Sequence, residues 1–147
     1  MKLKELVENK VKPYRPARPP LSAIIAGILG LLVEKKNSEV ILLPGIYYGL
    51  EKLAQKYPKY FQHVRFSKVG SEPHSERIED ILFRMGAFGL FSVGNPKFKY
   101  CNMPKAICQL VMNDIKELYG KEFIKALNPL ATDLVNYVTE YESSRKY

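Results

Sequence analysis

Apolar residues recur at helical spacing along most of the chain, and the strongest apolar run extends from Leu21 to Val33. This run is shorter than the roughly 20 residues that span a bilayer, so it predicts a buried helix over 21–36 and no membrane segment. Ser22 is the expected N-cap, and two lysines suit the negative C-terminal end of the helix. Small residues at helical spacing form a narrow face that another helix can approach closely: Ala23, Ala26, Gly27 and Gly30.

A second helix is expected to begin at Pro44, because proline is tolerated in the first turn of a helix. One face carries Ile46, Leu50, Leu53 and Tyr57, and another carries Tyr48, Lys52, Lys56 and Lys59. An aromatic ring beside three lysines can contact a nucleic-acid backbone, but a lysine stripe is also the usual solvated face of a helix. The preceding segment 40–43 is either a short buried strand or an apolar lead-in to the helix.

The segment 72–105 predicts a helix, a stop and then a β-hairpin. The helix starts at Pro73 and Ser75, stops at Gly86, and has an apolar face of Ile78, Ile81, Leu82 and Met85. The hairpin arms are 90–93 and 97–100, joined by a Gly-Asn-Pro turn. A helix followed by a hairpin is the second half of a winged helix-turn-helix, in which a short strand near 63–68 can pair with the hairpin.

The C-terminal third predicts two helices that pack against this core. Asn102 is the expected cap of a helix that runs to Tyr119, with Ile107, Leu110, Val111, Ile115 and Leu118 inward. Residues 121–127 form a short helical piece, and Asn128-Pro129 restarts the chain as a last helix. Its apolar positions are Leu130, Leu134, Tyr137, Val138 and Tyr141. These two helices are also a candidate homodimer surface.

The expected fold is therefore α+β and mostly α-helical, with a winged helix-turn-helix-like core, a β-hairpin wing and two C-terminal helices. A basic, proline-rich arm (1–20) precedes one domain (21–142), and a polar tail (143–147) follows it. The chain has no secretory signal at its start, and its two cysteines suggest a reducing compartment. We expect a cytoplasmic protein.

The formal net charge is +8 at pH 7, which suits a polyanionic partner. The first twenty residues contribute 6 − 2 = +4 of this excess. The candidate phosphate contacts lie on the arm, the second helix, the wing and just beyond it: Arg15, Arg18, Lys52, Lys56, Lys97, Lys99 and Lys105. The wing lysines have a second reading, because outward lysines also protect an exposed edge strand from aggregation.

The helix that would read DNA in a conventional repressor is acidic. Four carboxylates against Arg77 and Arg84 give −4 + 2 = −2 over 72–85, and Asp80 is spaced to pair with both arginines. A negative helix is repelled by phosphates, whereas binding requires the release of counterions. The wing is then the only part of this stretch expected to touch a nucleic acid.

The sequence contains no motif for catalysis, for a cofactor or for a metal. It has no phosphate-binding glycine loop and no nucleophile elbow, and the spacing of Cys101 and Cys108 matches no zinc module. An enzyme would need a deep polar pocket that joins His63 or His74 to one of these cysteines. We therefore expect no enzyme activity, no cofactor and no metal.

The order of motifs over residues 40–93 resembles the Panacea domain, the SocA-type antitoxin domain. The matching residues are Gly45-Ile46-Tyr47-Tyr48 with Leu50, then Pro73-His74-Ser75, and then Gly89-Leu90-Phe91. The chain departs from the family at Leu43-Pro44-Gly45, where the family has a Lys-Leu-Gln-Lys helix, and at Glu72, where the family tends to have glycine. The resemblance implies an antitoxin or adaptor role that works through protein contacts.

Two functions follow. The first is a non-catalytic regulatory module that binds nucleic acid through the basic arm and the wing. The second is a protein-interaction module of antitoxin or adaptor type, with the acidic helix as part of the partner surface. Binding to duplex DNA at rising salt separates them, because phosphate contacts weaken steeply with salt.

Overall fold

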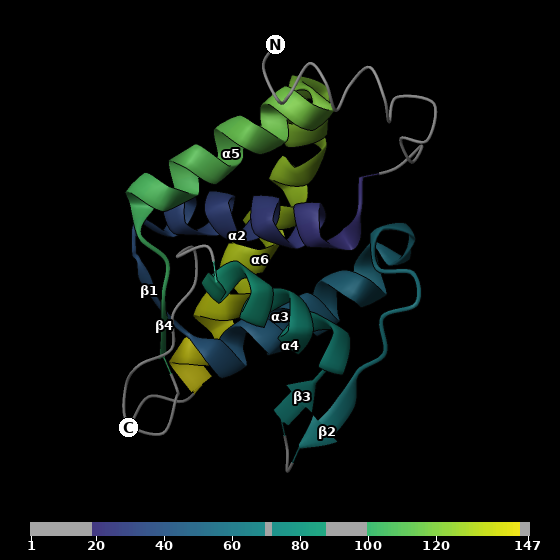
Figure 1. Ribbon diagram of the computed structural model, residues 1–147. Coiled ribbons are helices and arrows are strands. Elements are labelled where there is room, and N and C mark those ends of the chain that lie inside the picture. Colours follow the sequence, from purple (N-terminus) through teal and green to yellow (C-terminus); the bar gives the residue numbers. More distant parts are fainter. Residues whose placement is uncertain (1–18, 70–71, 88–99, 145–147) are drawn as a thin grey trace.

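The computed structural model describes residues 19–69, 72–87 and 100–144 of the chain (Figure 1). Helices dominate these residues, and the strands are short, so the fold is α+β and mostly helical. The elements in chain order are α2 (Leu21–Lys36), β1 (Val40–Leu42), α3 (Leu43–Lys56), η2 (Pro58–Tyr60), β2 (Ser67–Val69), β3 (Glu72–His74), α4 (Glu76–Ala87), β4 (Tyr100–Asn102), α5 (Lys105–Tyr119) and α6 (Lys121–Ser144).

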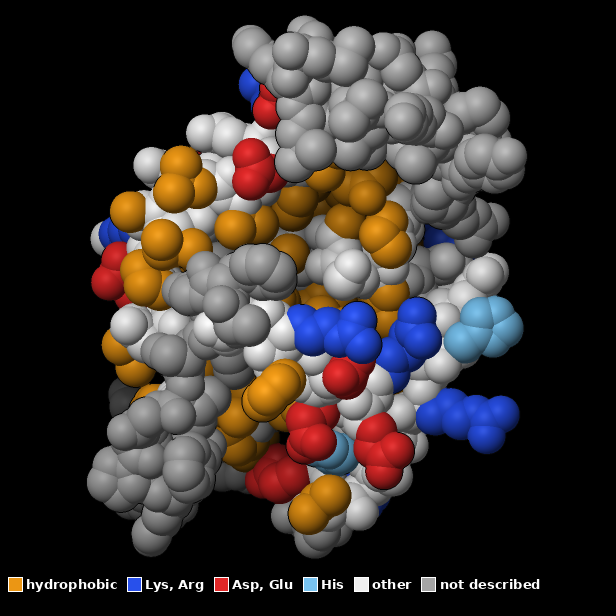
Figure 2. Space-filling model, viewed as in Figure 1, with side chains coloured by type: hydrophobic (Ala, Val, Ile, Leu, Met, Phe, Trp, Pro, Cys, Tyr) orange, Lys and Arg blue, Asp and Glu red, His pale blue; other side chains and the backbone are white. Residues whose placement is uncertain are grey.

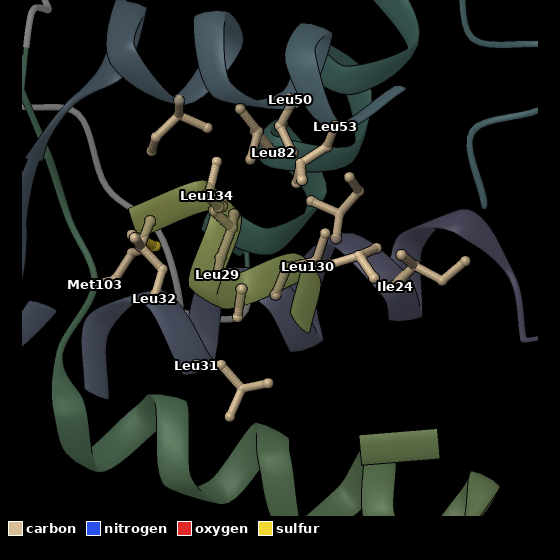
Figure 3. Close-up of a cluster of buried hydrophobic side chains, with 14 of the residues drawn as sticks. Ile24, Leu29, Leu31, Leu32, Leu50, Leu53, Leu82, Met103, Leu130 and Leu134 are labelled. Atoms are coloured by element: carbon tan, nitrogen blue, oxygen red, sulfur yellow. The ribbon is translucent and has the colours of Figure 1, made fainter. Parts of the chain in front are cut away.

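Helix α2 is the centre of the molecule. Figure 1 shows it between α5 on one side and α3, α4 and α6 on the other, and its packing is most extensive against α6 and α5. In Figure 3, Leu29 and Leu32 of α2 meet Leu130 and Leu134 of α6, with Leu50 and Leu53 of α3 above them, while Leu31 points toward α5. An almost wholly apolar helix is stable in water only when it is buried from several sides at once.

Two glycines of α2 allow the neighbouring helices to approach closely, as the sequence predicts. A Cβ at Gly30 would lie 2.9 Å from the sulfur of Met112 on α5, and a Cβ at Gly27 would overlap Leu127 of α6. The bounds 21–36 are also confirmed. Ser22 as the N-cap is wrong: Pro20 holds that position, and no side chain caps the helix.

Helix α6 is one continuous helix, so the predicted break at Asn128-Pro129 is wrong. Proline removes one backbone donor inside the helix, but Leu127, Leu130 and Ala131 around it are fully buried. Packing of this face against α2 and α3 outweighs the local cost. The hydroxyl of Thr132 donates to the carbonyl oxygen of Asn128 at 3.1 Å.

The strands form two separate antiparallel pairs. In the first, β1 pairs with β4, with Ile41 opposite Cys101, which settles segment 40–42 as a strand. In the second, β2 pairs with β3, so the strand predicted near 63–68 begins later, at Ser67, and has β3 as its described partner. The first arm, the turn and residues 97–99 of that hairpin lie outside the described residues.

Helix α4 has the predicted buried face, with Ile78, Ile81, Leu82 and Met85 all in the core. The hydroxyl of Ser75 accepts a hydrogen bond from the backbone N–H of Ile78 at 3.3 Å, which is the expected capping interaction. Pro73 lies in β3, so it does not start the helix, and the helix continues past Gly86 to Ala87.

Helix α5 differs from its prediction at both its start and its inward face. Asn102 belongs to β4, and the side chain of Glu39 accepts the backbone N–H of Lys105 at 2.7 Å, so a remote residue caps the helix. Leu110 and Leu118 are exposed, at 60% and 39%. Ile115 is buried as predicted, and Ile107 and Val111 are half-buried against the core. Cys108 and Met112, which the sequence does not predict to face inward, also lie on the side of α5 that meets α2.

No helix in the described ranges is long and apolar enough to cross a membrane.

Candidate functional site

The predicted basic contacts divide into two groups. Arg15, Arg18, Lys97 and Lys99 lie outside the described residues. Lys52 and Lys56 lie on α3, and Lys105 begins α5.

Lys56 lies at the C-terminal end of α3 and is engaged with α6. Its ammonium is 2.8 Å from Oδ2 of Asp133, and the hydroxyl of Tyr57 donates to the same oxygen at 2.6 Å. Burial raises the pKa of Asp133, but the hydrogen bonds from Lys56 and Tyr57 outweigh burial and leave that pKa below its usual value. The hydrogen bond to Asp133 raises the pKa of both Lys56 and Tyr57. The contacts of Lys56 and Tyr57 with Asp133 therefore link the end of α3 to α6.

Lys52 is one turn earlier on α3. Its ammonium lies 5.4 Å from the ring centroid of Tyr48, whose hydroxyl donates to Glu140 of α6 at 2.8 Å. That hydrogen bond is the main reason why the pKa of Tyr48 is raised. Tyr48 therefore also joins α3 to α6.

Lys105 lies on a different part of the molecule and shares no partner with the α3 lysines. Its ammonium donates to the side-chain oxygen of Asn37. It lines a cavity of about 580 Å³ between α2 and α5, together with Glu34 and Cys108. The structure does not bring Lys105, Lys52 and Lys56 into one binding surface.

A second cavity, which we call the basic cleft, has a volume of about 460 Å³. It lies where the start of α2, η2 and its following turn, the start of α4 and the start of α6 meet. Among the residues that the structure describes, none of those lining the cleft is acidic: Pro19, Leu21, Ile24, Lys59, Tyr60, Gln62, His63, Arg77 and Phe123. The lining thus combines two cations, a histidine and two aromatic rings.

The basic side chains reach the cleft from separate elements. The ammonium of Lys59 lies 5.1 Å from the ring centroid of Tyr60, and His63 has a left-handed backbone with a φ of 66°. Arg77 was expected to pair with Asp80, but Asp80 pairs with Arg84 at 3.2 Å, and Arg77 makes no ion pair with a residue that the structure describes.

Figure 2 shows a band of Lys and Arg side chains across the middle of the viewed face, over α4 and toward a histidine at its edge. Acidic side chains gather directly below this band, over the start of α4 and the β2–β3 pair. An acidic side chain also touches the band itself, so positive and negative groups are close neighbours on this face.

Sequence reasoning missed the basic cleft, although the chain carries a signal for it. Between Glu51 and Glu72 there is no acidic residue, while five basic residues alternate with aromatic ones: Lys52, Lys56, Lys59, Arg65 and Lys68 among Tyr57, Tyr60, Phe61 and Phe66. Basic residues interleaved with aromatic ones are typical of nucleic-acid-binding surfaces.

The two cavities separate the histidines from the cysteines among the described residues. His63 lines the basic cleft, and Cys108 lines the other cavity. His74 stacks on Tyr47 at 4.9 Å and lies 3.3 Å from Glu79. Burial raises the pKa of the Cys101 thiol to about 12 and that of Cys108 to about 11, which keeps both thiols protonated and unreactive. Within the described ranges, no three His, Cys, Asp or Glu side chains could hold a metal ion.

Comparison with protein-family models, with curated proteins and with solved structures found no match to this chain. The likeness to the Panacea domain stays a prediction.

Proposed function

We propose that this protein is a non-catalytic regulatory module that binds nucleic acid, and that the basic cleft is where it holds the phosphates. The observation that carries the proposal is the cleft itself, which has Lys59, His63 and Arg77 in its wall and no acidic side chain among its described lining residues. Lysine and arginine side chains that neutralise phosphates release counterions, which is the main source of affinity for nucleic acids.

The chain connection to the arm supports this location. Pro19 lines the cleft, and the basic arm with Arg15 and Arg18 directly precedes it in the sequence. This order supports a contribution of the arm to the same binding region. Lys56, in contrast, would first have to leave Asp133.

The winged-helix-like arrangement of residues 74–103 remains part of the proposal. Helix α4 supports it, as does β4, which begins at the last residue of the predicted second arm, Tyr100, and pairs with β1. In this arrangement the acidic face of α4 does not read a groove, and the phosphate contacts come from the cleft beside it.

A protein-interaction role of antitoxin or adaptor type is the second candidate. One observation favours it: Phe83, on the outer face of α4, is 79% exposed. An exposed aromatic side chain of this size can serve as an anchor in the contact to a partner protein.

The test is binding of the full chain to fluorescein-labelled DNA, as a single strand and as a duplex, followed by fluorescence anisotropy at rising salt. We expect affinity to fall steeply with salt. The double variant Lys59→Gln/Arg77→Gln should lower the slope of log K against log salt by about 1.4 for a single strand, since each phosphate contributes about 0.7.

The matched control is Lys125→Gln/Arg84→Gln, which removes the same charge from two exposed residues outside the cleft. It should change the slope much less. No binding of either DNA at low salt refutes the proposed function, and equal losses in the two double variants refute the cleft as its site.

A further inference from the structure

We propose that the basic cleft takes a segment of single-stranded nucleic acid and stacks a base on Tyr60 or Phe123. This inference rests on the proposed function and specifies its ligand. Three features of the cleft favour a single strand over a duplex: its size, its two aromatic rings, and the charge beside it.

The cleft is a cavity rather than a flat basic patch. Its volume of about 460 Å³ lies within the range of roughly 300–1,000 Å³ that is usual for small-molecule sites. A single nucleotide with an unstacked base fits a cavity of this class. A duplex keeps its bases stacked inside, so it can present only phosphates and sugars to such a cavity.

The two rings come from separate elements. Tyr60 lies in η2 and Phe123 lies in the first turn of α6, and both are half-buried. Phe123 is held in place by an edge contact to Tyr119, with ring centroids 5.5 Å apart. A ring that is fixed and still partly accessible is suited to stacking on a base, and such stacking tolerates any base because each has a π-face.

The cations are placed to hold the phosphates of the same nucleotide. Lys59 precedes Tyr60 directly, and Arg77 faces the cleft from α4. The first turn of α2 also lies at the cleft: it has no acidic residue and no side-chain cap, so its backbone N–H groups add positive potential there. The cations Lys59 and Arg77 thus line the same cleft as the aromatic rings of Tyr60 and Phe123.

The surroundings of Arg77 disfavour a duplex. Glu76, Glu79 and Asp80 lie on the exposed side of the same helix, and Figure 2 shows acidic side chains next to the basic band. A duplex along α4 would bring its phosphates close to these carboxylates. A single strand in the cleft can reach Arg77 without following α4.

The experiment compares three fluorescein-labelled ligands: an oligothymidine, the same strand in a duplex, and a strand of equal length with abasic sites in its middle. We expect the oligothymidine to bind at least about tenfold more tightly than the other two. Phe123→Leu should weaken oligothymidine binding about tenfold, since base–aromatic stacking is worth about that factor or more, and it should leave abasic binding unchanged.

Phe83→Leu is the matched control, because it makes the same change on an exposed side chain outside the cleft, and it should bind as the parent does. Thermal unfolding shows whether Phe123→Leu is folded. If it is not, Tyr60→Leu, on a different element, tests the same stacking. Equal affinity for duplex and single strand, or unchanged oligothymidine binding in both ring variants, overturns this inference and leaves the proposed function standing. No binding of any ligand refutes the proposed function itself.

Discussion

Two Lys–Tyr pairs lie three residues apart in the chain and have different surroundings. In both, the ammonium lies over the ring of the next residue, at 5.5 Å for Lys56 and Tyr57 and at 5.1 Å for Lys59 and Tyr60. The first pair converges on Asp133 of α6. The second lines the basic cleft, whose described lining residues include two aromatic rings and no carboxylate.

The difference teaches that the residue pair itself does not determine its role. At the first pair, a carboxylate from α6 uses both polar groups and joins two helices. At the second pair, α6 contributes Phe123 instead of a carboxylate. The cleft therefore has a second aromatic ring beside Tyr60. We infer that the Lys56 pair serves the fold and the Lys59 pair serves the ligand.

The largest expected effect tests whether the α3–α6 interface, which contains the first pair, is rigid. In Gly49→Ala the new Cβ would overlap the buried Leu134 of α6. Overpacking a core costs about 1–3 kcal/mol, which exceeds the gain from removing a helical glycine. We expect the free energy of unfolding, measured with urea, to fall by about 1–2 kcal/mol.

Gly45→Ala is the matched control on the same helix. Its new Cβ would lie 3.3 Å from Tyr141, so this substitution should lower the free energy of unfolding clearly less. Equal effects of the two variants would mean that the interface relaxes easily.

A smaller effect tests the carboxylate that distinguishes the two pairs. Asp133→Asn removes the negative charge that attracts Lys56 and leaves one weaker, neutral acceptor for the hydrogen bonds of Lys56 and Tyr57. Because the pair is near the surface and screened by water, we expect a loss of about 1 kcal/mol or less at pH 7. The folded state lowers the pKa of Asp133, so its stabilisation is present above the unfolded value of about 3.9 and is lost as pH falls through the folded pKa. The difference in urea midpoint between parent and variant should therefore disappear in acid. A constant difference across pH would exclude this origin.

The smallest effect on stability is expected for Lys59→Gln, which we compare with Lys56→Gln. Lys59→Gln should change the free energy of unfolding by less than about 0.5 kcal/mol, as is usual for a surface substitution, while weakening DNA binding. Lys56→Gln should lower stability and leave DNA binding nearly unchanged. Urea unfolding and anisotropy on the same two preparations measure both properties. The opposite assignment, with Lys56 required for DNA, would reverse the comparison.

The sequence predicts the helices well where one apolar face is clear. The bounds of α2 and the buried face of α4 follow directly from the spacing of Ile, Leu and Met residues. Leu110 and Leu118 were placed inward on the same reasoning, but they are exposed. Cys108 and Met112, on a neighbouring stripe, match the gap beside Gly30 better, and only the tertiary packing reveals which stripe faces the core.

Local signals fail where a remote residue decides. Pro129 is a sound signal for a helix start, yet burial of Leu127 and Leu130 keeps α6 continuous. Asn102 is a good N-cap type, yet pairing with Val40 uses it in a strand. The basic cleft was missed for the same reason, since Arg77 and Phe123 are far from Lys59 in sequence. The sequence shows that residues 52–71 contain no acidic side chain, but it does not show that Arg77 and Phe123 join Lys59 in one cleft.

Glu39 connects distant parts of the chain and thereby constrains the order of folding. Its carbonyl oxygen accepts the N–H of Met103 at 2.8 Å, and its side chain accepts that of Lys105 at 2.7 Å. Both contacts, and the neighbouring β1–β4 pair, require the closure of a loop of about 60 residues. Closing this loop is slow because the chain loses conformational entropy before the contacts that compensate for the loss have formed. The first turn of α5 should therefore gain protection from hydrogen exchange only after α2 and α3 have docked, although α5 itself is a local helix.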